Sequence, residues 1–384
     1  MTTPFTRGMS RATELTRAGR LDEATALIQS LLQPQPPAAD HPADSMVIEG
    51  DFSRLGDSVS APPRRAAGNA ASGIREGLGE TLRRIAAGGM PGRGPLTPQP
   101  LDLPEGARFL SLTHNGGHGS RHYRLYVPAR QPETPMPLIV MLHGCTQSPE
   151  DFALGTGMNG LAEEFGCLVA WPAQPQGANV QKCWNWFRPE DQARDRGEPA
   201  LLAGIVRDIL RDHPADAGRI YVAGLSAGGA AAAILGAAYP ELFSAIGVHS
   251  GLPVGGAQDV PSAFAAMRSG SKGKAQDRSV PAIVFHGLAD GTVHPSNGHA
   301  VVRQALQAGT AVKRSRVSGT SERGRAYRLN RHENPEGRSI CEHWEIEGAG
   351  HAWSGGQPGG SYTDPQGPDA SREMMRFFLQ HRQA

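Results

Sequence analysis

Short apolar runs alternate with amphipathic stretches from about residue 106 to the C-terminus. The apolar runs predict buried strands, and the stretches between them carry apolar residues at the spacing of helices. Strands joined by helices in this way are typical of a mainly parallel sheet flanked by helices. The expected strands are residues 122–127, 138–142, 167–171, 220–223, 245–249, 282–286 and 343–346, and the expected helices are 151–165, 199–212, 227–239, 298–307 and 370–382.

The N-terminal third has a different pattern. Residues 1–32 have helical spacing interrupted at Gly19, which predicts a short helical segment, either a small hairpin or a helix that binds a partner. Residues 33–105 are rich in Pro, Ala, Gly and Arg, and bury too little apolar surface to offset chain entropy. We therefore expect a mostly disordered linker over 33–105 and one folded α/β domain over 106–384, with a flexible N-terminal extension.

Charge and cysteine usage narrow the class of protein. With 38 Lys and Arg against 37 Asp and Glu, the net charge is +1, which offers no field to hold nucleic acid. No apolar run approaches the roughly 18 to 20 residues that span a bilayer, and no secretory signal is visible, so a cytoplasmic location without a membrane span is expected. The 4 cysteines lack paired CxxC spacing, so no zinc site is predicted from them.

The sharpest chemical signal is the sequence Gly224-Leu-Ser-Ala-Gly228, which lies between an apolar strand and an Ala-rich helix. A serine hydroxyl is a poor nucleophile unless a strained strand-to-helix turn presents it, and small neighbours allow the backbone to make that turn. Ser226 is therefore the candidate nucleophile.

A serine nucleophile needs a histidine base, which an acid orients. His351 lies in a glycine-rich turn after a late strand, where its side chain can point into a cleft. Asp290 comes just past the end of another strand, where open α/β sheets place functional side chains. Asp259 and Asp364 are weaker candidates because neither follows a strand, and an aspartate that caps a turn is the alternative for Asp290.

Two further sets of residues are candidates for the same site. The backbone N–H groups of Ala227 and Cys145 are expected to form an oxyanion hole, the first next to the serine and the second after strand 138–142. Trp184, Trp186 and Trp353 are candidate substrate contacts, because clustered aromatics can line an apolar groove. The alternative is that such aromatics seal the edge of the core.

Together these segments resemble the polyhydroxybutyrate depolymerase family of esterases, over nearly all of residues 107–384. The motifs that carry the resemblance are His143-Gly-Cys-Thr-Gln147, Gly155-Thr-Gly-Met-Asn159, Cys183-Trp-Asn-Trp-Phe187, Gly197-Glu-Pro-Ala200, Gly224-Leu-Ser-Ala-Gly228, His286-Gly-x-x-Asp290-x-Thr-Val293 and Gly350-His-Ala-Trp-Ser-Gly-Gly356. The resemblance implies an α/β-hydrolase fold and a triad of Ser226, Asp290 and His351. It also implies hydrolysis of 3-hydroxybutyrate ester bonds in a polyester or its oligomers, through an acyl-enzyme and without metal or organic cofactor.

The resemblance bears on location, partners and cysteine pairing as well. Secreted members carry a signal peptide and often a granule-binding domain, so an extracellular location is the alternative to the cytoplasm. A polymer granule or a protein is the possible partner of segment 1–32. Cys145 and Cys183 belong to two of the family-like motifs at one site, so a disulfide with Cα atoms under ~7 Å apart is expected between them, with Cys167 and Cys341 unpaired.

Two other functions compete with this interpretation. Feruloyl and acetylxylan esterases are close relatives of the resembled family, so a carbohydrate esterase is the nearest alternative. The more remote alternative is a non-catalytic binding protein, since a fold does not guarantee function.

Overall fold

The computed structural model describes residues 101–276, 278–306 and 312–383. The predicted helical segment 1–32 and nearly all of the predicted linker 33–105 lie outside these residues. In chain order the elements are β1 (Arg108–Gly116), β2 (Gly119–Val127), β3 (Met136–Leu142), α4 (Pro149–Thr156), α5 (Met158–Phe165), β4 (Leu168–Pro172), η1 (Pro189–Gln192), α6 (Gly197–Asp212), β5 (Ala215–Leu225), α7 (Ala227–Ala238), β6 (Ala245–His249), α8 (Val260–Ser269), β7 (Ala282–Gly287), α9 (Ser296–Ala305), β8 (Lys313–Thr320), β9 (Ala326–Glu333), β10 (Ser339–Ile346), β11 (Trp353–Ser354), β12 (Thr363–Asp364) and α10 (Ala370–Phe378).

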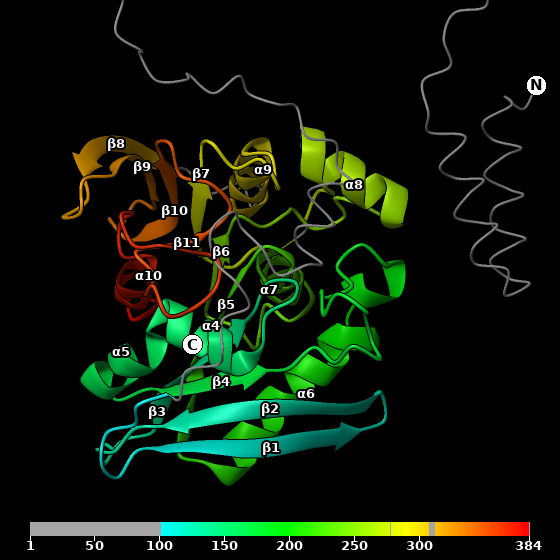
Figure 1. The fold of residues 1–384 in the computed structure, drawn as a ribbon, viewed down its shortest axis with the longest axis vertical. Helices are drawn as coiled ribbons and strands as arrows, with labels where there is room; N and C mark the ends of the chain where they lie inside the picture. Colours follow the sequence, from blue (N-terminus) through cyan, green and yellow to red (C-terminus); the bar gives the residue numbers. More distant parts are fainter. Residues whose placement is uncertain (1–100, 277, 307–311, 384) are drawn as a thin grey trace, which may run out of the picture. The chain divides into compact units, whose positions relative to one another are not determined.

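A single large sheet organises these elements (Figure 1). Its strand order is β1-β2-β4-β3-β5-β6-β7-β10-β9-β8, and a separate short pair joins β11 to β12. The central strands β4, β3, β5, β6, β7 and β10 are mutually parallel. Antiparallel hairpins close both edges, β1 with β2 on one side and β8 with β9 on the other. The predicted α/β architecture with a mainly parallel sheet is confirmed.

Helices cover both faces of the sheet, because successive side chains of each buried strand point to opposite sides. On β3, Leu138, Val140 and Leu142 pack into one core cluster, together with side chains of α6, α7 and α9. Ile139 and Met141 of the same strand pack into the other cluster, with α4, α5 and α10. A strand buried on both faces requires a continuous apolar run, which is the pattern that located β3 in the sequence.

The differences from the sequence prediction have local causes. The helix expected over 151–165 is broken into α4 and α5 at Gly157, which adopts φ 63° and caps α4. The strands β1, β8 and β9 were not predicted, because most of their side chains are polar and few are buried, so they give no apolar run. Within the described residues no helix is both long and apolar enough to span a membrane.

The first turn of α7 lies directly against the end of β3. A Cβ atom on Gly228 would collide with the carbonyl oxygens of Leu142 and His143, so glycine is required for this close approach. Gly160 of α5 is a matched contrast, since a Cβ atom there would meet nothing within 4 Å.

We predict that these two glycines respond to alanine in opposite directions. Gly228→Ala should lower the free energy of unfolding by about 1 to 3 kcal/mol or more through overpacking. Gly160→Ala should raise it by about 0.4 to 1 kcal/mol, because it restricts the unfolded chain at a compatible helical position. Urea denaturation of the two variants and the parent measures both effects. Equal unfolding midpoints for the two variants would contradict the close approach of α7 to β3.

Candidate active site

Ser226 occupies a sharp turn between β5 and α7. Its backbone has φ 59° and ψ −119°, a conformation that is costly for a residue with a side chain. The neighbouring strand holds this turn, because the Ser226 N–H donates to the carbonyl of His249 at 2.9 Å. The carbonyl of Ser226 in turn accepts from the N–H of Ala230 at 3.0 Å, in the first turn of α7. The predicted strand-to-helix turn is therefore present, with the serine at its apex.

Asp290 and His351 meet beyond the ends of β7 and β10. His351 Nδ1 lies 2.8 Å from Asp290 Oδ2. The other carboxylate oxygen accepts the N–H groups of Thr292 and Val293, each at 2.9 Å. Burial acts to raise the pKa of Asp290, but the His351 imidazole and these donors outweigh it and hold that pKa below its usual range. An ionised carboxylate only accepts, so the proton of neutral His351 lies on Nδ1 and Nε2 is left basic.

One cavity of about 370 Å³ connects these groups with the rest of the predicted site. Its wall is mainly apolar, and none of the described residues that line it is Asp, Glu, Lys or Arg. The lining residues are Gly144, Cys145, Asn179, Gln181, Cys183, Trp186, Phe187, Leu225, Ser226, Ala227, Leu252, Val260, Ala263, Phe264, Met267, Thr292, Val293, His351 and Tyr362. Ser226 and His351, predicted from separate motifs, thus open onto the same space.

The loop after β3 is held rigidly beside Ser226. Both predicted oxyanion-hole residues, Cys145 and Ala227, line the cavity. Within the loop, His143 Nδ1 donates to the Gly144 carbonyl at 2.7 Å, and its Nε2 accepts the N–H of Gln174 at 3.1 Å. Burial lowers the pKa of His143 to about 4, so the ring is neutral and serves as one donor and one acceptor. His143 therefore positions the loop.

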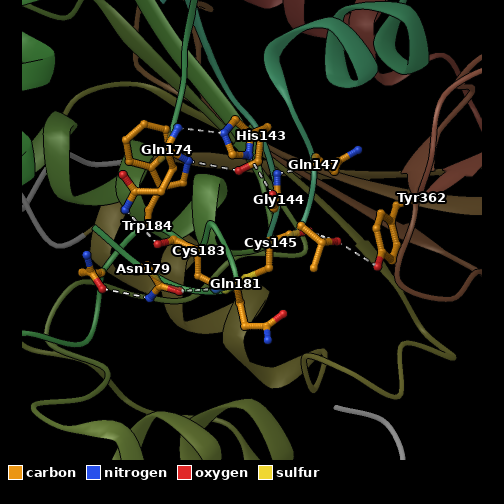
Figure 2. The surroundings of a disulfide bond; sticks show 12 residues. His143, Gly144, Cys145, Gln147, Gln174, Asn179, Gln181, Cys183, Trp184 and Tyr362 are labelled. Carbon is orange, nitrogen blue, oxygen red and sulfur yellow. Dashed lines mark hydrogen bonds between the residues drawn. A yellow bond between two sulfur atoms is a disulfide. The ribbon is translucent and has the colours of Figure 1, made fainter. Parts of the chain in front are cut away.

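A disulfide joins this loop to the aromatic loop that follows β4 (Figure 2). Cys145 and Cys183 are bonded, with Cα atoms 4.2 Å apart, within the expected distance. The N–H of Thr146 adds a backbone hydrogen bond to the Gln181 carbonyl at 2.7 Å. Cys167 and Cys341 are buried free thiols, as predicted, and burial raises the pKa of each to about 12.

A buried polar network supports the same loop from behind. Glu198, at the start of α6, accepts the backbone N–H of Asn185 at 2.7 Å and the Asn185 side-chain amide at 2.8 Å. It also accepts the side-chain amide of Gln174, which donates further to the Cys183 carbonyl at 2.9 Å. Burial and then the nearby Asp191 raise the pKa of Glu198. This network gives the Gly197-Glu-Pro-Ala200 motif a role, since it fixes the chain on both sides of Cys183.

The aromatic residues divide between the cavity and the core. Trp186 lines the cavity, as predicted, and Phe187 lies beside it. Trp184 and Trp353 were expected at the substrate, but both are fully buried core residues that do not line this cavity. The Trp184 indole N–H donates to the His143 carbonyl at 3.1 Å, and that of Trp353 donates to Ser371 Oγ at 3.0 Å. For these two the alternative interpretation, that aromatics complete the core, is correct.

The competing acids have structural roles. Asp259 caps α8, where its side chain accepts the Ser262 N–H at 2.8 Å in a capping box. Asp364 pairs with Arg325 at 3.1 Å.

The sequence analysis missed α8, whose side chains Val260, Ala263, Phe264 and Met267 form part of the cavity wall. A usable signal was present, because Asp259 followed closely by Pro261 is a common start of a helix. Tyr362 was also missed, and nothing in its neighbouring sequence marked it as a cavity residue.

We predict that the Cys145–Cys183 disulfide contributes substantially to stability. It closes a separation of 38 residues, for which the chain-entropy model gives about 3 to 4 kcal/mol. The Cys145→Ser, Cys183→Ser double variant should lose that much free energy of unfolding in urea, and the parent should lose a similar amount under reducing agent. Cys167→Ser serves as the control that removes a thiol but no bridge. Alkylation of all four thiols in oxidised, denatured protein would show that the bridge does not form.

Sequence and structure comparisons relate the chain to known depolymerases and esterases. Poly(3-hydroxyalkanoate) depolymerase C of Paucimonas lemoignei is 31% identical over 240 residues, which cover 59% of this chain and 57% of that protein. Poly(3-hydroxybutyrate) depolymerase of Ralstonia pickettii is 28% identical over 275 residues, covering 64% and 54%. Feruloyl esterase B of Thermothelomyces thermophilus is 30% identical over 200 residues, covering 47% and 67%. The chain thus spans little more than half the length of the two depolymerases.

A solved acetyl xylan esterase from Aspergillus awamori superposes with a TM-score of 0.56 at 18% identity, covering 71% of this chain and 99% of that one. This likeness shows the fold, which is the α/β-hydrolase fold expected from the sequence. The family model described as esterase PHB depolymerase matches residues 121–323. Since that match covers more than half of the chain, the protein belongs to the esterase PHB depolymerase family.

Proposed function

We propose that the protein is a serine esterase that hydrolyses short-chain hydroxyalkanoate esters, 3-hydroxybutyrate esters among them, in a polyester or its oligomers. The observation that carries the proposal is the Asp290–His351 hydrogen bond at the edge of the cavity that contains Ser226. Family membership and relatives named as depolymerases and esterases support it.

The geometry supports a two-step acyl transfer. Ser226 Oγ attacks the ester carbonyl carbon while His351 Nε2 takes its proton, and ionised Asp290 stabilises the imidazolium that forms. The N–H groups of Ala227 and Cys145 then donate to the developing oxyanion; each such donor is typically worth about 2.7 to 4 kcal/mol. His351 returns the proton to the leaving alcohol, and water hydrolyses the acyl-serine by the same route. None of these steps needs a metal or an organic cofactor.

The cavity wall favours a neutral, aliphatic acyl group. Leu252, Val260 and Met267 present aliphatic surface, and the lining set carries no charged side chain other than a protonated His351. Asn179 and Gln181 also line the wall and add polar residues to it, which suits a hydroxy-ester. A short hydroxyalkanoate ester fits such a wall, because it has both an aliphatic chain and polar ester oxygens.

A carbohydrate esterase is the second candidate. The similarity to feruloyl esterase B and to the acetyl xylan esterase structure favours it. Against it, the cavity wall is mainly apolar, whereas a sugar presents several hydroxyl groups that need polar partners.

The Cys145–Cys183 disulfide also bears on where the protein works. Disulfides persist in oxidising compartments and are rare in the cytoplasm. This favours the extracellular alternative over the cytoplasmic location expected from the N-terminal sequence. A polymer granule or protein partner for residues 1–32 stays a prediction, because these residues lie outside the described structure.

A comparison of substrates tests the proposal. We expect soluble 3-hydroxybutyrate oligomers to be cleaved with a higher kcat/KM than feruloyl or acetyl esters of xylan sugars. Ser226→Ala should lower turnover by a factor on the order of 10⁴ or more on every cleaved substrate, with the fold intact by circular dichroism. A preference for the sugar esters would favour the second candidate. Activity in the Ser226→Ala protein within tenfold of the parent would overturn the serine mechanism.

A second prediction concerns the acid. Asp290→Asn should reduce kcat by about 10⁴, because asparagine favours the wrong tautomer of His351. Asp259→Asn is the matched control, since asparagine caps a helix as well as aspartate does, and both stability and activity should stay near the parent's values. Steady-state kinetics of the two variants separate the alternatives. A large loss of kcat in Asp259→Asn alone would show that Asp259, and not Asp290, is the acid.

A further inference from the structure

Two histidines and a glutamate meet at a point that the esterase mechanism does not use. His299 lies in the first turns of α9, and His343 and Glu345 lie on β10. Residues two apart on a strand share one face of the sheet, so His343 and Glu345 point to the same side. Potential ligand atoms of His299, His343 and Glu345 all lie within 4.8 Å of one another.

His343 is buried, and its Nε2 has no hydrogen-bond partner among the described residues. Its side chain is 3% exposed. The ring packs edge-on against that of His299, with ring centroids 4.8 Å apart. A buried polar group left in this state costs free energy that a bound ligand would recover.

Glu345 is already oriented toward the two histidines. Its Oε2 accepts the side-chain amide of Asn330 at 2.9 Å and lies 4.0 Å from Arg328 Nε. Its Oε1 faces the cluster, 3.5 Å from His299 Nε2. One carboxylate oxygen is thus held by its neighbours while the other remains available, which is how outer groups orient a metal-binding carboxylate.

We propose that His299, His343 and Glu345 bind one divalent transition-metal ion of the zinc type. Two imidazoles and one carboxylate match zinc's preference, and a fourth position would be left for water. Metal–ligand bonds of about 2.1 Å allow two ligand atoms to be at most ~4.2 Å apart, so the cluster must contract slightly. The His299 side chain is 49% exposed and can rotate to close this gap, whereas the two β10 ligands are fixed by the sheet.

The ion would stabilise the packing of α9 against β10. Glu345 is the ladder neighbour of His286 on β7, and His286 Nε2 donates to the Val293 carbonyl at 2.8 Å, in the loop that carries Asp290. The metal site therefore lies behind the catalytic-acid loop, on the sheet face that α9 covers. This role is structural and separate from the chemistry at Ser226. The spacing of the cysteines gave no sign of this site, because no cysteine takes part in it.

Direct metal binding by the full-length protein tests the inference. After treatment with EDTA and removal of the chelator, the parent should bind one equivalent of Zn²⁺ by calorimetry and retain it through gel filtration. At zinc well above Kd, the Tm of the parent should rise by about 5 °C. His299→Ala and Glu345→Gln should bind at least tenfold more weakly and lose the Tm rise. His118→Ala, which removes an exposed histidine between β1 and β2, is the matched control and should behave as the parent.

Cobalt provides a spectroscopic readout of the same ligands. The Co²⁺-loaded parent should show a visible absorption band, which His299→Ala should lack. Absence of stoichiometric Zn²⁺ binding by the parent would overturn the inference. So would equal affinity of the parent and His299→Ala, because the ion would then bind elsewhere. Circular dichroism of the Glu345→Gln and His299→Ala proteins distinguishes loss of binding from loss of folding.

Discussion

The turn at Ser226 depends on the close approach of three backbone segments. The end of β3 leaves Gly228, in the first turn of α7, no room for a Cβ atom, and Gly228 and Leu142 leave none for Gly224 at the end of β5. Hydrogen bonds to His249 and Ala230 then hold Ser226 at a positive φ. Backbone strain of this kind persists only where the surrounding structure holds the residue firmly in the strained conformation. The buried parallel strands supply that rigidity, and they also bring their carboxyl ends to one edge of the sheet.

Candidate site residues from distant parts of the chain come together at that edge. β3 leads to the loop with Cys145, β5 to Ser226, β7 to Asp290 and β10 to His351. The rim of the cavity is less regular, because it consists of loops and α8 rather than strands. At this rim the disulfide and the Glu198 network hold segment 173–198 in place. The hydrogen bonds of the sheet hold the strand ends in the same way. A loop without such supports would hold Cys145 less firmly, and oxyanion stabilisation depends on preorganised donors.

The sequence predicted the parts that local patterns control. Apolar runs located the central strands, and glycines around Ser226 marked the turn, because both features follow from burial and sterics along a few residues. β1, β8 and β9, at the two sides of the sheet, were missed because they are half solvated and polar. The roles of Trp184 and Trp353 were assigned wrongly, since whether an aromatic faces a cavity or the core depends on segments far away in the chain. Motif composition cannot supply that information.

The histidines of this structure have different roles because their surroundings differ. Burial lowers the pKa of His143 to about 4 and that of His249 to about 3, and each ring accepts a backbone N–H, from Gln174 and Ser354 respectively. These two rings are neutral, and their hydrogen bonds to backbone N–H groups hold the neighbouring loops in place. His351 differs because its partner is the Asp290 carboxylate and its ring borders the cavity beside Ser226, which is the arrangement that the proposed mechanism requires of a general base. His343 differs again, since it is buried and its Nε2 has no hydrogen-bond partner among the described residues, and the metal ion proposed to bind it with His299 and Glu345 would supply that partner.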